Sequence, residues 1–225
     1  LVRCSNNQIG RERLIANLQK YRPWNSNYDQ RISIVEGDLA QPLLGLSTEN
    51  FQDLSQKIDV IYHIGADISY IKPYQTLKLA NVQGTQEVLR LATTFKIKQI
   101  EYVSSMGVFG SAWLLHGWDK LDENSNYKQN LQELAVENGY IQTKWVAEIV
   151  IENAMNQGLP IRVYRPGFIE SSTNGSTSND ADFFCRMLKG CIQLGYYPDL
   201  PYKYWIMTPV DYIANVMVWV GQRHT

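Results

Sequence analysis

The prediction of the fold starts from one stretch, QIEYVSS at residues 99–105. This short run is rich in apolar and β-branched residues, as buried strands are, and it ends in two serines. Similar runs precede and follow it along the chain, DVIYHIGA (59–66) and IRVYRPG (161–167). Helical stretches separate them, from about Tyr74 to Phe95 and from about Tyr140 to Asn156. This alternation predicts a parallel sheet covered by crossover helices.

The same alternation continues toward both ends of the chain. The additional elements expected are a strand end at residues 1–5, a helix at 9–21, a strand at 31–39, a helix at 48–58 and two helices near 183–195 and 209–221. Thr48 is the expected cap of the helix that begins there. The predicted fold class is therefore α/β, a doubly wound parallel sheet.

Two stretches interrupt this order, residues 106–138 and the polar residues 170–182. Long loops beyond the carboxyl ends of parallel strands are where such sheets bind ligands. We therefore expect a dinucleotide-binding domain over residues 1–170. Residues 171–225 are expected to form a mobile loop and part of a substrate-side lobe.

The composition excludes several kinds of partner. The 225 residues are 44% hydrophobic and 19% charged, with a net charge of −1, so nothing favours nucleic acid or an anionic membrane. The chain has neither an apolar run of the roughly 18 residues that span a membrane nor a signal-peptide pattern. Cys4, Cys185 and Cys191 are an odd set without CxxC spacing or nearby histidines. We expect no metal site and a reducing, cytoplasmic setting.

Tyr140 and Lys144 carry the strongest chemical signal, together with Ser105. Residues at i and i+4 share a helix face, so the Lys144 ammonium is expected near the Tyr140 phenol, where it would favour the ionised form. Ser105, at the end of the preceding strand, would bind the carbonyl oxygen that the phenol protonates while a nicotinamide delivers hydride. A Tyr-x-x-x-Lys pattern also occurs by chance, and the strand order around it favours the catalytic role.

Several motifs follow an order that is typical of one superfamily. They are Asp38-Leu39, Tyr62-His63-x-x-Ala66, Asn81-x-x-Gly84-Thr85, Val103-Ser104-Ser105, Gly139-Tyr140-x-x-x-Lys144-Trp145-x-x-Glu148 and Arg165-Pro166-Gly167. With them the chain resembles the extended short-chain dehydrogenases/reductases, whose fold is Rossmann-like. Pro73-Tyr74, Lys144-Trp145-Val146-Ala147-Glu148 and Pro209-Val210-Asp211 are most similar to thioester reductase domains. Such domains occur in nonribosomal peptide and polyketide synthetases, carboxylic acid reductases and alpha-aminoadipate reductases.

The resemblance implies roles for particular residues. Ser105, Tyr140 and Lys144 fall on the family's catalytic positions, and Lys144 would also hold the nicotinamide ribose. The residues implied in cofactor binding are Arg3, Arg13, Asp38, Leu39, His63, Ala66, Asn81, Val103, Tyr140, Lys144, Pro166 and Gly167.

These implied positions cover most of a dinucleotide. Asp38 and Leu39 would lie against adenine, residues 63–66 along the ribose and pyrophosphate, and Pro166 and Gly167 beside the nicotinamide. Asn81 would steady the active-site strand.

Three of these residues have a structural alternative. The Asp38 carboxylate is suited to capping a turn. His63 would equally be a strand-end histidine with its hydrogen bonds satisfied inside the protein, and Asn81 would equally bond within the helix layer. The sequence leaves these alternatives open.

Arg3 and Arg13 bear on the choice of cofactor. Arg3 follows a strand end, where the adenosine ribose of a dinucleotide lies, and a guanidinium suits a 2′-phosphate. Residues 1–5 contain no acidic residue of the kind that would select NAD. The thioester reductases carry a second arginine at the spacing of Arg13, although Arg13 also fits a solvated helix face. We therefore expect NADPH.

The chain departs from the family pattern in two ways. The Gly-rich turn that binds pyrophosphate at a helix N-terminus is missing, so we expect that turn and its strand before Leu1. Ser105 stands where these reductases usually have threonine, a change that keeps the hydroxyl. We also expect the substrate lobe to continue past Thr225.

The implied function is NADPH-dependent reductive release of a carrier-bound acyl or peptidyl thioester as an aldehyde or alcohol. The implied partner is a carrier domain with a phosphopantetheine arm in the same polypeptide. An NAD-dependent nucleotide-sugar epimerase or dehydratase is the first alternative, but it would not favour Arg3 beside the adenosine ribose. A non-catalytic dinucleotide sensor is the second, and it would have little need of an intact set of Ser105, Tyr140 and Lys144.

Overall fold

The computed structural model describes residues 1–110, 121–173, 179, 182–199 and 206–223. It falls into two compact units, of which the first comprises residues 1–16 and 24–165 and the second residues 17–23 and 166–225. The domain division predicted at residues 170 and 171 stays a prediction. Within the described part of the chain, none of the helices is both long and apolar enough to cross a membrane.

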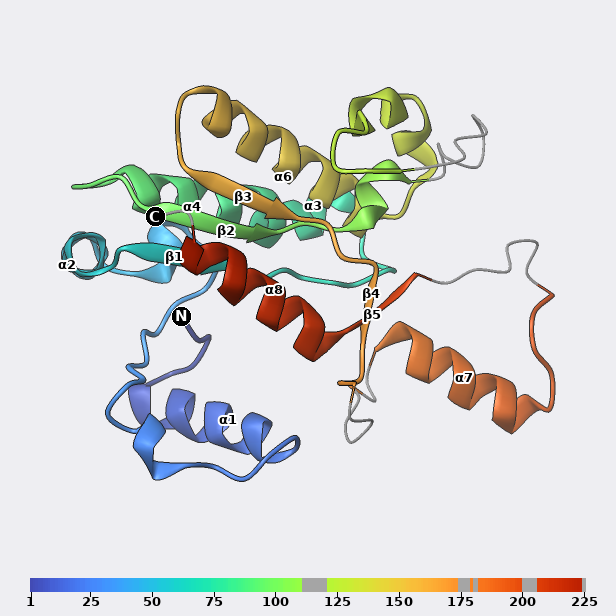
Figure 1. Cartoon of the computed structure of the whole chain (residues 1–225), viewed down its shortest axis with the longest axis horizontal. Coiled ribbons are helices and arrows are strands. Elements are labelled where there is room, and N and C mark those ends of the chain that lie inside the picture. Colours follow the sequence, from blue (N-terminus) through green and yellow to red (C-terminus); the bar gives the residue numbers. More distant parts are fainter. Residues whose placement is uncertain (111–120, 174–178, 180–181, 200–205, 224–225) are drawn as a thin grey trace. The chain divides into compact units, whose positions relative to one another are not determined.

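The first unit is built on a parallel sheet (Figure 1). Its strands are β1 (Val60–His63), β2 (Gln99–Val103) and β3 (Ile161–Tyr164), in the order β1-β2-β3. Ile100 of β2 lies between Ile61 and Ile161. All three strands run the same way because a helix returns the chain between each pair. The predicted α/β class with a parallel sheet is confirmed.

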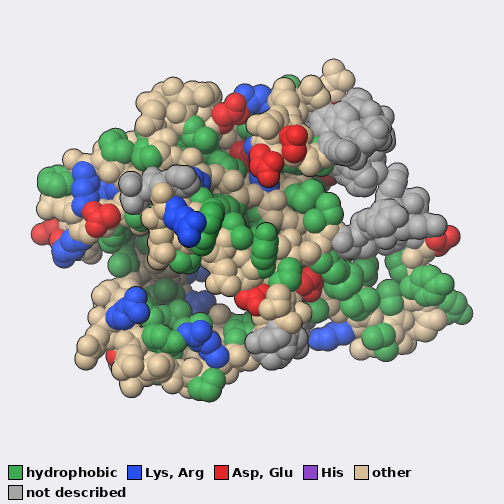
Figure 2. Space-filling view, in the orientation of Figure 1, with side chains coloured by type: hydrophobic (Ala, Val, Ile, Leu, Met, Phe, Trp, Pro, Cys, Tyr) green, Lys and Arg blue, Asp and Glu red, His purple; other side chains and the backbone are tan. Residues whose placement is uncertain are grey.

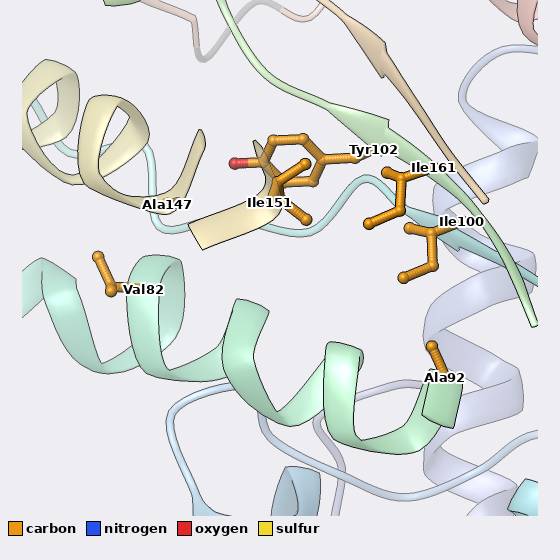
Figure 3. Close-up of a cluster of buried hydrophobic side chains, with 7 residues drawn as sticks. All are labelled: Val82, Ala92, Ile100, Tyr102, Ala147, Ile151 and Ile161. Atoms are coloured by element: carbon orange, nitrogen blue, oxygen red, sulfur yellow. The ribbon is translucent and has the colours of Figure 1, made fainter. Parts of the chain in front are cut away.

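Helices connect and cover these strands. The helical elements up to Arg165 are α1 (Asn7–Gln19), η1 (Ser26–Tyr28), η2 (Pro42–Gly45), α2 (Thr48–Lys57), α3 (Tyr74–Lys78), η3 (Leu79–Gln83), α4 (Gly84–Thr93), η4 (Met106–Phe109), η5 (Tyr127–Leu131), η6 (Glu133–Val136) and α6 (Gly139–Asn156). In Figure 3, side chains from the helix over 79–93 and from α6 meet side chains of β2 and β3. This cluster is the main core, and its buried hydrophobic members are Val82, Ala92, Ile100, Tyr102, Ala147, Ile151 and Ile161.

The helix predicted from Tyr74 to Phe95 is present with one interruption. Residues 79–83 form a π-helical turn, η3, between α3 and α4. Such turns are frequent at functional sites. Asn81 is buried inside this turn.

Three local predictions are wrong. Residues 31–39 form no strand, and their only ladder contact with the N-terminal residues is a parallel bridge between Val2 and Glu36. The strand expected at 1–5 is likewise reduced to that bridge. Ser47, rather than Thr48, caps α2, because its hydroxyl accepts the Asn50 N–H at 3.1 Å.

The second unit pairs two short parallel strands, β4 (Phe168–Glu170) and β5 (Met207–Pro209), and carries helices α7 (Phe183–Leu194) and α8 (Val210–Arg223). Asp211 ties its parts together, since its carboxylate accepts the backbone N–H of Thr173 at 3.0 Å. Hydrophobic side chains gather on the surface of α7 in Figure 2. Most of the predicted polar loop 170–182 lies outside the described residues, as do residues 111–120 of the predicted insertion.

Candidate functional site

Ser105 follows the carboxyl end of β2, the position at which the sequence predicts an active-site hydroxyl. It caps η4, and its hydroxyl oxygen accepts the Gly107 N–H at 3.0 Å. A side chain at Gly107 would lie 3.2 Å from both the Ser105 hydroxyl and Ile141, which is tighter than most packed contacts. The serine hydroxyl is therefore held by the first turn of η4, close to the start of α6.

Tyr140 occupies the first turn of α6. The helix begins there because Asn138 caps it, accepting the Ile141 N–H at 3.0 Å. Gly139 fits because a Cβ at this position would lie 2.5 Å from the Lys72 carbonyl oxygen. The Tyr140 ring packs against that of Tyr70, with the ring centroids 5.8 Å apart.

The Tyr140 phenol lies near enough to the Ser105 hydroxyl to be influenced by it, so the structure brings together the two groups that the sequence paired. Burial and the neighbouring Tyr70 raise the pKa of Tyr140 to about 12, and the nearby Ser105 opposes that rise. The expected shift toward the ionised phenol is therefore wrong here. The phenol is held protonated at neutral pH, as a proton donor must be.

Lys144 lies one turn further along α6 and is only 4% exposed. Its ammonium donates to the Tyr102 hydroxyl at 2.9 Å and to the Val103 carbonyl at 2.8 Å. Burial lowers the pKa of Lys144 to about 8, while Glu148 opposes the shift. Lys144 is thus fixed at the end of β2, with the predicted residue Val103 as a backbone partner.

Asn81 joins two elements of the site. Its amide bonds both backbone groups of Asp67, through the Asp67 N–H at 2.7 Å and the Asp67 carbonyl at 3.0 Å. The same amide donates to the hydroxyl of Thr143 at 2.9 Å. Asn81 therefore holds the loop after β1 against α6, where the sequence suggested a role on the active-site strand.

His63 is buried, and its Nε2 lies 3.0 Å from the hydroxyl oxygen of Thr85. That hydroxyl gives its only hydrogen to the Asn81 carbonyl at 2.7 Å, so His63 must be the donor, in its Nε2–H tautomer. Burial, with a smaller effect of the Lys144 charge, lowers the pKa of His63 to about 3. The ring therefore has a hydrogen-bond partner inside the protein, and its contact with a cofactor stays a prediction.

Asp38 and Leu39 form the turn that faces the ends of the strands. The Asp38 carboxylate accepts the Ala40 N–H at 2.9 Å, so it caps that turn. Leu39 packs closely enough that a Cβ at Gly84 would lie 2.6 Å from the Leu39 carbonyl oxygen. Ala66 is half-buried and precedes the Asp67 backbone that Asn81 holds. Contact of these residues with a cofactor stays a prediction.

Arg3 and Arg13 are close together on the surface. The Arg13 guanidinium donates to the backbone carbonyl of Arg3, and both side chains are exposed. Within the described residues, no carboxylate forms an ion pair with either of them. Exposed guanidinium groups without an acidic partner suit an anionic ligand.

Pro166 and Gly167 belong to the second unit. Gly167 is required by close packing, because a Cβ there would lie 2.3 Å from the Ile206 carbonyl oxygen. Pro166 is buried. The proposed position of both residues beside a nicotinamide stays a prediction.

Three acidic or thiol groups of the second unit also lie close together. Single ligand-type atoms of Glu170, Asp182 and Cys185 lie within 4.8 Å of one another. Asp182 has a local explanation, because it caps α7 by accepting the Cys185 N–H at 2.8 Å. Burial and Asp182 raise the pKa of Glu170. This cap gives Asp182 a structural role at the start of α7.

One part of the site was quoted from the sequence without a role. Glu148 is 1% exposed and accepts hydrogen bonds from Ser104 and, at 2.7 Å, from Nε of Arg165. The three residues join α6, the end of β2 and the end of β3. The sequence shows that a carboxylate, Glu148, follows Lys144 by four residues. It does not show that Arg165, 17 residues further along the chain, is the partner of Glu148.

The chain is similar in sequence to much longer curated proteins. The chain is 38% identical over 219 residues to the nonribosomal peptide synthetase asaC of Aspergillus flavus, which covers 97% of this chain and 21% of that protein. It is 36% identical over 221 residues to the aldehyde reductase lnaA of the same species, covering 98% and 21%. The chain thus spans about a fifth of the length of these curated relatives.

Solved structures show the same relationship. The terminal R domain from the myxalamid PKS-NRPS biosynthetic pathway is 39% identical with a TM-score of 0.86, covering 99% of this chain and 55% of that one. A UDP-glucuronic acid 4-epimerase from Bacillus cereus shares the fold alone, at 17% identity and a TM-score of 0.55. The resemblance to synthetase reductase domains is confirmed. The family model described as "Male sterility protein", NAD_binding_4, matches residues 1–217, and this chain belongs to that family.

Proposed function

We propose that this chain carries out the NADPH-dependent reductive release of a carrier-bound acyl or peptidyl thioester. The observation that carries the proposal is that Ser105, after the end of β2, lies near Tyr140 in the first turn of α6, with Lys144 buried one helical turn away. The pair supplies two hydroxyls for one carbonyl oxygen. The names of the relatives, a peptide synthetase and an aldehyde reductase, support a reduction as the reaction.

The chemistry of the side chains fits a dinucleotide with an extra phosphate. Arg13 contacts the backbone of Arg3, and both residues carry exposed guanidinium groups, which suit the 2′-phosphate of NADPH. Lys144 uses two of its three ammonium hydrogens on Tyr102 and Val103, which leaves one for a ribose hydroxyl. NADPH, when bound, supplies the hydride.

Tyr140 and Ser105 then stabilise the negative charge that develops on the carbonyl oxygen. As hydride reaches the thioester carbon, the C=O bond gives up an electron pair to oxygen, and Tyr140 donates a proton there while Ser105 donates a hydrogen bond. Lys144 places a positive charge on the same helix face as the resulting phenolate. The hemithioacetal then collapses: its hydroxyl returns a proton to the Tyr140 phenolate as the C=O bond re-forms, the C–S bond breaks, and sulfur leaves with the electron pair and takes up a proton to become a thiol, so that an aldehyde remains.

The carrier partner follows from the same comparison. The chain matches about a fifth of a peptide synthetase, so we infer that it acts as one domain of a larger polypeptide. A phosphopantetheine thioester on a carrier domain of that polypeptide is the proposed substrate, and the cytoplasm is the proposed setting.

The test is to incubate the full-length domain with NADPH and an acyl-pantetheine thioester. Free thiol should be released in equal amount to the first hydride consumed, because reduction must expel the sulfur. Consumption of up to twice as much NADPH as thiol would mean that the aldehyde is reduced again to an alcohol. NADPH loss without thiol, or conversion of UDP- or dTDP-sugars, would overturn the proposal.

The cofactor is tested by Arg3→Ala in the same domain. Loss of a charge-assisted hydrogen bond should weaken NADPH binding by about 1.5–3 kcal/mol while leaving NADH nearly unchanged. Arg31→Ala is the matched control, because this exposed arginine lies outside the Arg3 and Arg13 pair. Equal losses for both cofactors, measured by fluorescence titration, would contradict the phosphate assignment.

A further inference from the structure

A buried ion pair holds the ends of β2, β3 and the middle of α6. One carboxylate oxygen of Glu148 accepts from Nε and Nη2 of Arg165, at 2.7 and 2.6 Å. The other oxygen accepts the hydroxyl hydrogen of Ser104. An unpaired carboxylate would be costly at 1% exposure, so this set of partners is what permits Glu148 to be ionised there.

Arg165 is itself held on both sides by aromatic rings. Its guanidinium carbon lies 5.5 Å from the centre of the Phe109 ring and 5.3 Å from that of Tyr127. Both rings belong to a buried cluster after β2, and Phe109 ends the short helix that Ser105 caps. The ion pair therefore fixes the backbone on both sides of Ser105, through Ser104 before it and η4 after it.

Glu148 also lies one helical turn from Lys144 on α6, and both side chains are buried. The other titratable groups around the Lys144 ammonium are Tyr102 from β2, to which it donates, and His63 from β1, whose imidazole is neutral at physiological pH. Tyr140, on the same helix, carries no charge below about pH 12. Glu148 is thus the anion that favours the charged form of Lys144 against its burial.

We propose that Glu148 is a positioning residue of the reductase site, which fixes Ser105 through Ser104 and Arg165 and supplies the negative charge that Lys144 needs beside it. This inference rests on the proposed function for its kinetic effect. Its electrostatic part concerns the protein alone, and it is measurable without substrate.

The decisive variant is Glu148→Gln in the full-length domain. Glutamine keeps the size and an oxygen for Arg165 but removes the charge. We expect the apparent pKa of Lys144, followed by NMR of ¹³C-labelled lysine side chains, to fall by about one unit, in the range of a single charge partner. The alkaline limb of the kcat/KM profile should move to lower pH by the same amount.

Glu152→Gln is the matched control. Glu152 lies one turn further along α6 and pairs with Lys128 and Tyr127, at 2.6 and 2.9 Å. It is expected to leave the Lys144 titration at the wild-type value. Glu148→Asp should restore most of the titration because it restores the charge, even where the shorter side chain lowers kcat.

The outcomes separate this inference from the proposed function. An unmoved Lys144 titration in Glu148→Gln overturns the inference, whatever the substrate is, and a wild-type domain that reduces no thioester overturns the function alone. If Glu148→Gln does not fold, Ser104→Ala carries the test, since it keeps the carboxylate and Arg165. We expect Ser104→Ala to lower kcat several-fold with its alkaline limb unchanged, and wild-type kcat would overturn the positioning role.

Discussion

Helices α6 and α7 are both rich in apolar residues, but they differ in what surrounds them. Six residues of α6 are buried, and half of these are polar: Thr143, Lys144 and Glu148. No residue of α7 is buried, and Ile192 is 80% exposed there. Apolar periodicity predicted both helices equally well. Burial of polar groups with specific partners is what distinguishes α6, the helix on which the proposed catalytic residues lie, from α7.

The largest expected effect follows from losing the proton donor on α6. Tyr140→Phe in the full-length domain should lower kcat by about 10²–10⁴-fold, the contribution of a general acid. The NADPH dissociation constant should stay within a few-fold, because the ring still packs against Tyr70. Stopped-flow absorbance at 340 nm gives the rate, and fluorescence titration gives the affinity.

The control for this change is Tyr62→Phe, which removes the hydroxyl of a tyrosine that is 45% exposed on β1. It should keep wild-type turnover. A near-native kcat in the Tyr140→Phe domain would show that Tyr140 is not the proton donor. The proposed catalytic difference between α6 and α7 would then be lost.

A second pair of variants tests the difference in burial directly. Ile151→Ala on α6 removes a fully buried side chain and should lower the free energy of unfolding by about 2–5 kcal/mol. Ile192→Ala on α7 should change it by less than about 0.5 kcal/mol. Urea denaturation followed by circular dichroism measures both. Similar losses would show that α7 is packed in solution as closely as α6.

The last expected effect is on the pH dependence of unfolding and concerns His63, which lies in the polar network beside α6. Its folded-state pKa of about 3 is below the ordinary value of 6.5, so the unfolded chain binds a proton first. This group therefore stabilises the fold fully above about pH 6.5, and the contribution is lost as pH falls toward 3. His63→Gln should flatten the pH dependence of unfolding over that window. An unchanged slope would contradict a neutral, buried His63.

The sequence predicted the order of the elements well because strand and helix periodicities are local. It also placed Ser105 and Tyr140 together, since one ends a strand and the other begins the next long helix. It did not predict the Glu148 and Arg165 pair, because their contact depends on how two elements pack. The strand at residues 31–39 was wrong for the same reason: the apolar pattern is present, but only Glu36 has a strand partner.

The pKa values could not be predicted either. Sequence spacing indicated only that Lys144 and Tyr140 share a helix face. The structure turns the ammonium toward Tyr102 and Val103, and burial then dominates both groups. The direction in which a side chain points from a helix face depends on neighbouring residues from other elements. The local sequence pattern contains no information about these neighbours.

Because of the π turn at residues 79–83, the geometry of the site depends on the number of residues in this helix. Removing one residue to leave a regular α-helix would rotate the side chains before the deletion by about 100° relative to those after it. Asn81 would then lose its position between Asp67 and Thr143, while Thr85 kept its own. Point substitutions along this helix are thus a milder change than any insertion or deletion. Sequences aligned across it should be compared first for gaps and only then for residue identity.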